Sequence, residues 1–201
     1  MHRRFFLQGL AASTLMTMFP FASAALSAVT EWDSFEEGTD TIEAASPSAK
    51  ALYCPGILRL SSTHHKGSYT FKFRDEAGNY DNDILASLNW FLRCGDGTWQ
   101  YMDIGTVEML NYMSKTLGDP LILVHSAYRS PQYNAKIENA ARNSLHMYGK
   151  AVDFSVPGIS IREVCSHSLL ARNTAGRGGV GYYPGKGFVH LDSGAYRQWL
   201  K

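Results

Sequence analysis

The chain has 201 residues, and its 19 lysines and arginines nearly balance its 18 acidic residues. A formal net charge of +1 argues against a nucleic-acid-binding protein, because neutralising a phosphate backbone requires a strongly basic surface. Hydrophobic residues make up 45% of the chain and charged residues 18%, which excludes a wholly disordered chain and supplies the core of one domain.

The N-terminal segment has the pattern of an export signal. Arg3 and Arg4 precede an apolar stretch that ends at residues 22–24 in Ala-Ser-Ala, which is typical of a cleaved twin-arginine signal peptide over residues 1–24. The stretch is shorter than the ~20 residues that span a bilayer, and no later apolar run is long enough, so we expect no membrane span after cleavage. Residues 25–50 are rich in Asp and Glu and predict an acidic, flexible leader. Residues 51–201 then form the folded domain, in the periplasm or cell envelope.

The first part of the domain predicts a hairpin followed by two helices. Apolar and polar residues alternate over 57–60 and again over 69–73, with a polar turn between them. The period then changes to that of a helix over 81–95 and over 103–118. Apolar residues expected to point inward from the second helix are Ile104, Val107, Leu110 and Met113.

The second part predicts three strands and two further helices. A short apolar run over 121–124 suits a buried strand, and Ser130 before a proline predicts the start of a short helix. Strands are expected over 151–156 and 188–192, and Ser160 with Glu163 predicts the start of a helix between them. Because strands and helices do not strictly alternate, the expected fold class is α+β.

Gly176, Gly178 and Gly181 have the spacing of a phosphate-binding loop, but they follow a helix and lead toward a strand. This order is the reverse of a dinucleotide-binding site. We interpret the segment as a flexible loop that carries Tyr182 and Tyr183 toward a cleft, where a tyrosine contacts substrate or simply packs.

Three cysteines allow at most one internal disulfide. Cys165 falls on the apolar face of a predicted helix, so we expect a small core residue and not a reactive thiol. A bridge between Cys54 and Cys94 stays open, because sequence gives no geometry for it.

His146, Asp153 and His190 have the residue types of a catalytic zinc site, in which three protein ligands leave one position for water. Gly149 allows a sharp turn after His146, and the chain then enters the strand that carries Asp153. If this strand neighbours the last one, Asp153 and His190 meet one ion. The alternative is that all three are ordinary buried polar residues.

A family resemblance strengthens the metal interpretation. The pattern His-x-x-Gly-x-Ala-x-Asp over 146–153, followed by the late strand histidine His190, resembles the zinc D-Ala-D-Ala carboxypeptidases and murein endopeptidases. Their superfamily includes lysostaphin-type peptidases and the hedgehog domain. Motifs at 126–130, 178–184 and 188–192 resemble an exported bacterial branch of it, and the likeness extends from Ile57 to Trp199. It implies a small antiparallel sheet with helices packed on it.

The resemblance also implies roles for single residues. His146, Asp153 and His190 would hold one Zn²⁺, whose bound water becomes a nucleophile. Arg129 matches an arginine that stabilises the substrate oxyanion, although a structural ion pair is the alternative. Ser144 matches a serine that contacts substrate, or else it is a turn residue.

The general base is the point where the sequence departs from many relatives. Their Glu or His before the last ligand is replaced by Gly187 and Phe188, which move no proton. Asp192 is the candidate, because it returns to the face of His190 two residues along the strand; the alternative is that it supports that ligand. Tyr183 is a candidate substrate contact.

The resemblance therefore implies an exported zinc metallopeptidase that hydrolyses peptide bonds in peptidoglycan cross-links and has stem peptides as its partners. Two alternatives remain. One is a carboxypeptidase that removes terminal D-alanine, and the other is a zinc-stabilised module that binds cell-wall peptides without turnover. The segment His65-Lys66-Gly67 also resembles a motif of the same branch, which suggests a cleft contact near the hairpin turn; the alternative is an exposed turn histidine.

Overall fold

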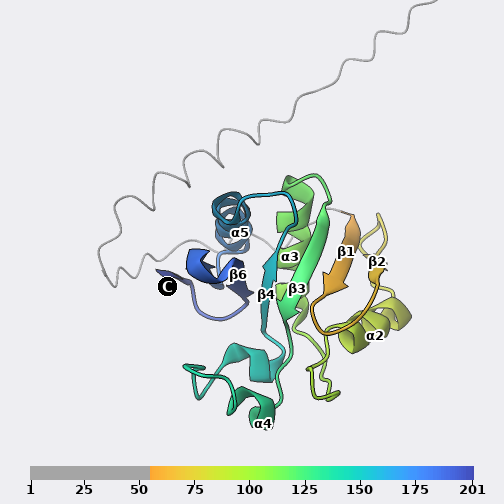
Figure 1. Cartoon of the computed structure of the whole chain (residues 1–201). Helices are drawn as coiled ribbons and strands as arrows, with labels where there is room; N and C mark the ends of the chain where they lie inside the picture. Colours follow the sequence, from red (N-terminus) through yellow and green to blue (C-terminus); the bar gives the residue numbers. More distant parts are fainter. Residues whose placement is uncertain (1–54) are drawn as a thin grey trace, which may run out of the picture.

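The computed structural model describes residues 55–201, which form one seven-stranded sheet with helices packed against it (Figure 1). The predicted signal peptide, the acidic leader and Cys54 lie outside the described residues. The strands are β1 (Gly56–Ser62), β2 (Ser68–Arg74), β3 (Leu121–Ser126), β4 (Ala151–Ser155), β5 (Gly179–Tyr183), β6 (Phe188–Asp192) and β7 (Arg197–Leu200). The helices are α2 (Asn82–Phe91), α3 (Ile104–Thr116), α4 (Pro131–Asn134) and α5 (Ile161–Ala175), with 3-10 turns η2 (Leu145–Tyr148) and η3 (Pro184–Lys186). None of the helices in this part of the chain is long and apolar enough to cross a bilayer.

The sheet is mixed, and its strands follow the order β2-β1-β3-β4-β6-β5-β7. This arrangement is compatible with the predicted α+β class, but the expectation of an antiparallel sheet was wrong. Strand β1 pairs with β3 in parallel, and β5 pairs with β7 in parallel. A parallel pair needs a long crossover, and α2 and α3 supply it between the hairpin and β3.

The helices begin where their capping residues predict. The Asp81 carboxylate accepts backbone hydrogen bonds at the start of α2, and the Asp103 and Ser160 side chains do the same for α3 and α5. Helix α2 ends at Phe91, before the predicted stop at residue 95. One inward prediction was wrong: Ile104 is 40% exposed, because it is the first residue of α3 and precedes the packed stripe.

The main core lies between the sheet and helices α3 and α5, which contact each other and cover one face of the sheet (Figure 1). Val152 and Phe154 of β4 point into this core and are buried. Side chains alternate along a strand, so Asp153 between them points to the opposite face. That opposite face carries the candidate site.

The glycine-rich segment forms a strand where a flexible loop was predicted. Its residues 179–183 make β5, which pairs with β6 on one side and with β7 on the other. A Cβ on Gly181 would lie 2.6 Å from the ring of Trp199, so glycine makes room for that indole. Glycine at this position therefore allows close packing against Trp199. Strand β7, which carries Trp199, was not predicted.

Candidate metal centre

The pairing of β4 with β6 brings two of the predicted ligands together. Asp153 and His190 are Cα partners in the antiparallel ladder, so their side chains leave the same face of the sheet. His146 comes from η2, just before a left-handed turn at Gly149 (φ 64°). That turn packs closely on its neighbours, since a Cβ on Gly149 would lie 2.4 Å from the carbonyl oxygen of Tyr101. The three ligands are buried, and one potential ligand atom from each lies within 4.8 Å of the others.

Hydrogen bonds outside the cluster fix which nitrogen of each imidazole faces inward. Nδ1 of His146 lies 2.7 Å from the carbonyl oxygen of Ala127, which only accepts, so this nitrogen carries the proton and donates it. Nε2 of His190 likewise donates to Oδ2 of Asp192, at 3.0 Å. The remaining nitrogens, Nε2 of His146 and Nδ1 of His190, face each other at 3.2 Å. The residues therefore fit a metal ion, because hydrogen bonds of this kind orient metal-binding histidines.

The charges of the cluster favour a bound cation. Burial alone would raise the pKa of Asp153, but His146 and His190 outweigh it and hold that pKa well below its usual value. Burial lowers the pKa of His146, which is therefore neutral at pH 7. Burial would also lower the pKa of His190, yet its hydrogen bonds to Asp153 and Asp192 raise it instead. An ionised carboxylate and a neutral imidazole are the forms that bind metals, whereas a proton on His190 competes with one.

Arg129 lies directly beside the ligands. Its Nε donates to the hydroxyl of Ser126 at 2.7 Å, and its Nη2 donates to Oδ2 of Asp153. The ion pair considered as an alternative for Arg129 is therefore present in the structure. It also holds the guanidinium at the edge of the ligand cluster.

Asp192 is fully buried and touches the side of His190 that faces away from the cluster. Its Oδ1 accepts from the backbone N–H groups of Gly179 at 3.1 Å and Gly194 at 2.8 Å, and its Oδ2 accepts from Arg197 at 2.6 Å. Burial would raise the pKa of Asp192, but the hydrogen bond and charge of His190, the Gly194 N–H group and the charge of Arg197 lower it. Both oxygens are thus engaged, which favours support of His190 over proton transfer.

The two predicted substrate contacts lie on either side of the cluster. Ser144 is buried at the N-terminal boundary of η2, two residues before His146. Tyr183 lies on β5, on the same sheet face as His190, where it stacks on Phe188 with ring centroids 4.6 Å apart. Its hydroxyl accepts a hydrogen bond from Nε1 of Trp199 at 2.9 Å.

Two aromatic neighbours of the site were not predicted. The ring of Trp199 lies 5.2 Å from that of His190, and the strand that carries it has no clear sequence signal. His125 lies on β3 with Nε2 2.8 Å from the hydroxyl of Ser155, which shares the face of Asp153. Because side chains alternate along β4, the sequence could show that Ser155 and Asp153 share a face. Only the pairing of β3 with β4 shows that His125 lies beside them.

Two imidazoles and one carboxylate converge on the sheet face opposite α3 and α5, and hydrogen bonds from outside the cluster orient both imidazoles. They define a candidate site for a single divalent metal ion of the kind used by metallohydrolases. The family model described as "Peptidoglycan L,D-endopeptidase MepK" matches residues 50–199. The chain belongs to this family, which is part of the M15 superfamily of zinc D-Ala-D-Ala peptidases.

Curated relatives bear the same name. The peptidoglycan L,D-endopeptidase MepK of Escherichia coli strain K12 is 36% identical over 152 residues, which cover 72% of this chain and 80% of that protein. The protein of the same name from Shigella flexneri has the same identity and coverage. A probable MepK of Haemophilus influenzae is 42% identical over 82 residues, covering 39% of this chain and 42% of that protein. The predicted superfamily is confirmed, and the chain is a hydrolase.

Proposed function

We propose that this protein is an exported zinc peptidase that hydrolyses an L,D peptide bond in the cross-links of peptidoglycan. The observation that carries the proposal is the convergence of His146, Asp153 and His190, with both imidazoles fixed in the orientation that ligands require. Relatives named for this activity support the substrate and the bond. The export pattern of residues 1–24 supports the compartment in which that substrate occurs.

The metal would be held by Nε2 of His146, a carboxylate oxygen of Asp153 and Nδ1 of His190. When bound, zinc supplies a water of lowered pKa and polarises the substrate carbonyl. Residues around the site orient the two imidazoles: the carbonyl oxygen of Ala127 binds His146, and the carboxylate of Asp192 binds His190. Asp192 is thereby a positioning residue.

Arg129 is proposed to bind the substrate carbonyl oxygen as negative charge develops on it. A guanidinium has five N–H donors, and the bonds to Ser126 and Asp153 use two of them. The same two bonds fix the plane of the guanidinium before substrate arrives. A donor fixed in advance stabilises an oxyanion more than a mobile one, because no reorganisation is needed during the reaction.

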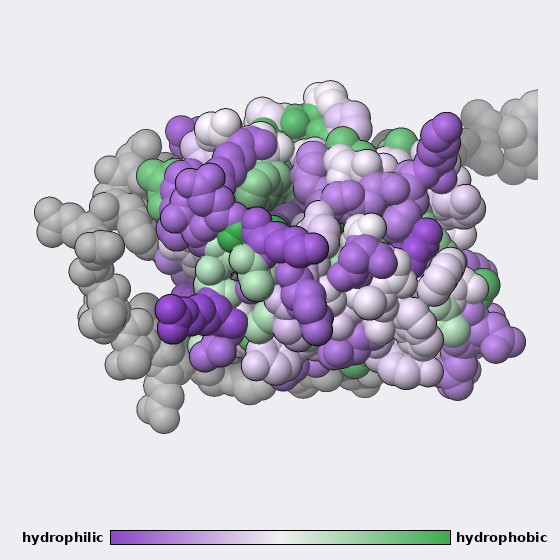
Figure 2. All heavy atoms as spheres, turned by 60° about the horizontal axis from the view of Figure 1, so that its bottom comes forward, coloured by the Kyte–Doolittle hydropathy of each residue, from purple (hydrophilic) through white to green (hydrophobic). Residues whose placement is uncertain are grey.

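The substrate is proposed to lie across the sheet face that α3 and α5 leave uncovered. An aromatic wall lies on the β5 side of the ligands and consists of Trp199, Tyr183 and Phe188. Ser144 lies on the η2 side. Figure 2, which turns the lower part of Figure 1 forward, shows hydrophobic residues only in small patches among hydrophilic ones. Such a surface suits a polar peptide-sugar polymer better than a large apolar partner.

Digestion of purified peptidoglycan tests the proposal. The protein would be incubated with the polymer after zinc loading, after chelation, and after zinc is restored, and the soluble fragments would be separated by chromatography. We expect uncrosslinked muropeptides to appear only with metal. Released D-alanine would support the carboxypeptidase instead, and an unchanged fragment pattern with retained binding would support the binding module.

A further inference from the structure

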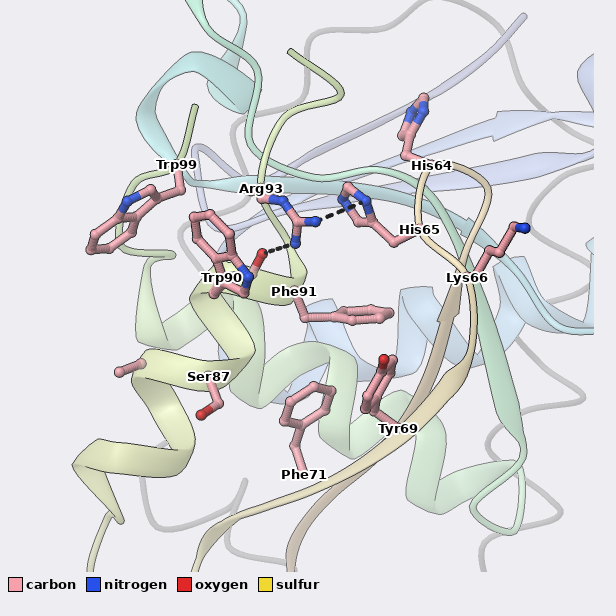
Figure 3. A pocket seen from close by; sticks show the side chains of 11 residues that line it. His64, His65, Lys66, Tyr69, Phe71, Ser87, Trp90, Phe91, Arg93 and Trp99 are labelled. Carbon is pink, nitrogen blue, oxygen red and sulfur yellow. Dashed lines mark hydrogen bonds between the residues drawn. The ribbon is translucent and has the colours of Figure 1, made fainter. Parts of the chain in front are cut away.

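A second feature lies at the same end of the sheet as the metal centre and is not used by the proposed mechanism. It is a pocket of about 990 Å³ between the β1–β2 loop and the C-terminal end of α2 (Figure 3). This volume lies in the range of sites that take a small organic ligand. None of the three metal ligands lines the pocket.

Aromatic side chains form much of the pocket wall, and several remain exposed. Trp90 and Trp99 are 53% and 47% exposed, and Tyr69 from β2 is exposed as well. Phe91 packs edge-on against Tyr69, with ring centroids 5.5 Å apart. Exposed indoles that gather at a pocket are typical of binding sites, since each offers a flat apolar face and one polar N–H group.

The charge of the pocket is positive. Arg93 and Lys66 line it, and none of the described residues that line it is acidic. Arg93 donates to the carbonyl oxygen of Trp90 at 2.7 Å and to Nδ1 of His65 at 3.2 Å, and its guanidinium lies 4.4 Å from the Trp90 ring centroid (Figure 3). Burial and the neighbouring Arg93 lower the pKa of His65, so the histidine is neutral at pH 7. The two remaining cations favour a ligand that carries a carboxylate.

The sheet register places the pocket and the metal centre at the same end of the strands. Ser62 of β1 pairs with Val124 of β3, and Ser126 at the end of β3 pairs with Asp153 of β4. The loop that follows β1 therefore leaves the sheet at the level of Asp153. By strand order, β2 lies three strands from β4, which corresponds to roughly 14 Å between the strands. The register puts Tyr69 and Phe71 on the face that α3 and α5 cover, opposite to Asp153, so a ligand would reach both places only around this end of the sheet.

Two chain segments connect the pocket with the metal centre. After Arg93, the Asp96 carboxylate accepts a hydrogen bond from Ser130, the residue that follows Arg129. After Trp99, the ring of Tyr101 packs edge-on against the indole at 5.4 Å, and the Tyr101 backbone contacts the turn after His146. Both segments therefore link the pocket wall to residues that neighbour Arg129 and His146.

We propose that this pocket binds the sugar-bearing end of a stem peptide, with an amino-sugar ring on Trp90 and Trp99 and a nearby peptide carboxylate on Arg93 and Lys66. The inference rests on the proposed function and deepens it. Peptidoglycan joins an acidic peptide to an amino sugar, which matches a cationic pocket with aromatic walls. Three or four extended residues span about 10–14 Å, which is comparable with the spacing between strands β2 and β4.

Calorimetric titration with two non-cross-linked ligands tests the proposal without requiring turnover. One ligand is a stem tripeptide, and the other is the same tripeptide attached to its disaccharide. We expect the wild-type protein to bind the disaccharide-tripeptide about tenfold more tightly than the tripeptide. Trp99→Ala and Trp90→Ala should each reduce this preference, and Arg93→Gln should weaken the binding of both ligands.

Tyr196→Ala is the matched control, because Tyr196 is an exposed aromatic residue that does not line the pocket. It should keep the wild-type preference, and thermal unfolding would verify that every variant is folded. Equal affinity of the wild-type protein for both ligands, or a preference that survives both tryptophan substitutions, overturns the proposal. Absence of peptidoglycan hydrolysis would contradict the proposed function. The pocket proposal would still be decided by the measured preference for the disaccharide-tripeptide.

Discussion

Asp192 and Asp153 bind the two nitrogens of the same imidazole, that of His190. Nδ1 lies 2.7 Å from Oδ1 of Asp153, and Nε2 lies 3.0 Å from Oδ2 of Asp192. The ring is therefore held from both ends, with one carboxylate in the ligand cluster and the other outside it. The sequence alone left two roles open for Asp192, general base and support of His190, and this geometry favours support.

The substitution Asp192→Asn should weaken metal binding as well as turnover. An amide keeps the shape of the side chain but loses the charge that orients and polarises His190, and such changes typically cost ~10- to 100-fold in metal affinity. Competition with a zinc-binding dye would measure the affinity. Asp119→Asn is the control, because the Asp119 carboxylate pairs with Lys115 and is not in the ligand cluster. Unchanged affinity with lost hydrolysis would return Asp192 to the role of general base.

The substitution His146→Ala should remove stoichiometric zinc and abolish hydrolysis, because two remaining ligands bind zinc poorly. Metal content after dialysis, measured by elemental analysis, checks the first part. His167→Ala is a suitable control, since the His167 ring bonds Thr116 and is not in the ligand cluster. Full hydrolysis by a zinc-free His146→Ala preparation would refute the proposed site.

The substitution Arg129→Lys should reduce kcat by about two orders of magnitude while zinc stays bound. Lysine keeps the positive charge beside Asp153 but loses the planar group that also reaches Ser126. Steady-state kinetics on a cross-linked muropeptide, with zinc content measured in parallel, would separate the two effects. Arg162→Lys on the exposed surface of α5 provides the comparison. A variant with wild-type kcat would leave Arg129 as a structural ion pair only.

Zinc affinity should decrease as the pH falls from about 8 to about 6. The pKa of His190 is raised above that of an ordinary histidine, so its Nδ1 begins to hold a proton at a higher pH than usual. Metal binding must displace this proton, and the competition becomes stronger with each step toward acid. Titration calorimetry in buffers of different ionisation enthalpy would count the released protons. Binding without proton release near pH 7 would contradict this account.

Cys165 should resist alkylation in the native protein. Burial raises the pKa of its thiol to about 12, so almost no thiolate exists near pH 8, and the side chain is buried in the core. Mass spectrometry after treatment with iodoacetamide, with and without denaturant, would show the difference at this residue. Labelling of Cys165 at equal rates in both conditions would show that its helix does not pack as described.

Local signals in the sequence predicted most elements of the fold because their causes are local. Asp81, Asp103, Ser130 and Ser160 cap the four helices that were expected after them. The mixed character of the sheet was missed, because parallel pairing depends on which strands meet and not on their own composition. Strand β7 was missed because its four residues, two polar followed by two apolar, do not alternate.

The ligand set could be proposed from residue types and a family motif, and support of His190 by Asp192 could be considered because the two residues share a strand face. That Ala127 would fix the imidazole of His146 could not, because it follows from the path of the backbone around the site. The same applies to Trp199, which reaches His190 only because β7 pairs with β5. Contacts of this kind join residues that are far apart in the chain, and no local pattern encodes them.

The register of β4 and β6 also limits how genes of this family can change in length. Neighbouring residues of a strand point to opposite faces, so inserting or deleting one codon within either strand would turn Asp153 or His190 into the helix-covered core. The stretch from 135 to 143, which leads from α4 toward η2, forms no ladder pairing. Natural insertions and engineered fusions should therefore accumulate there, while the spacing from Asp153 to the end of its strand stays constant.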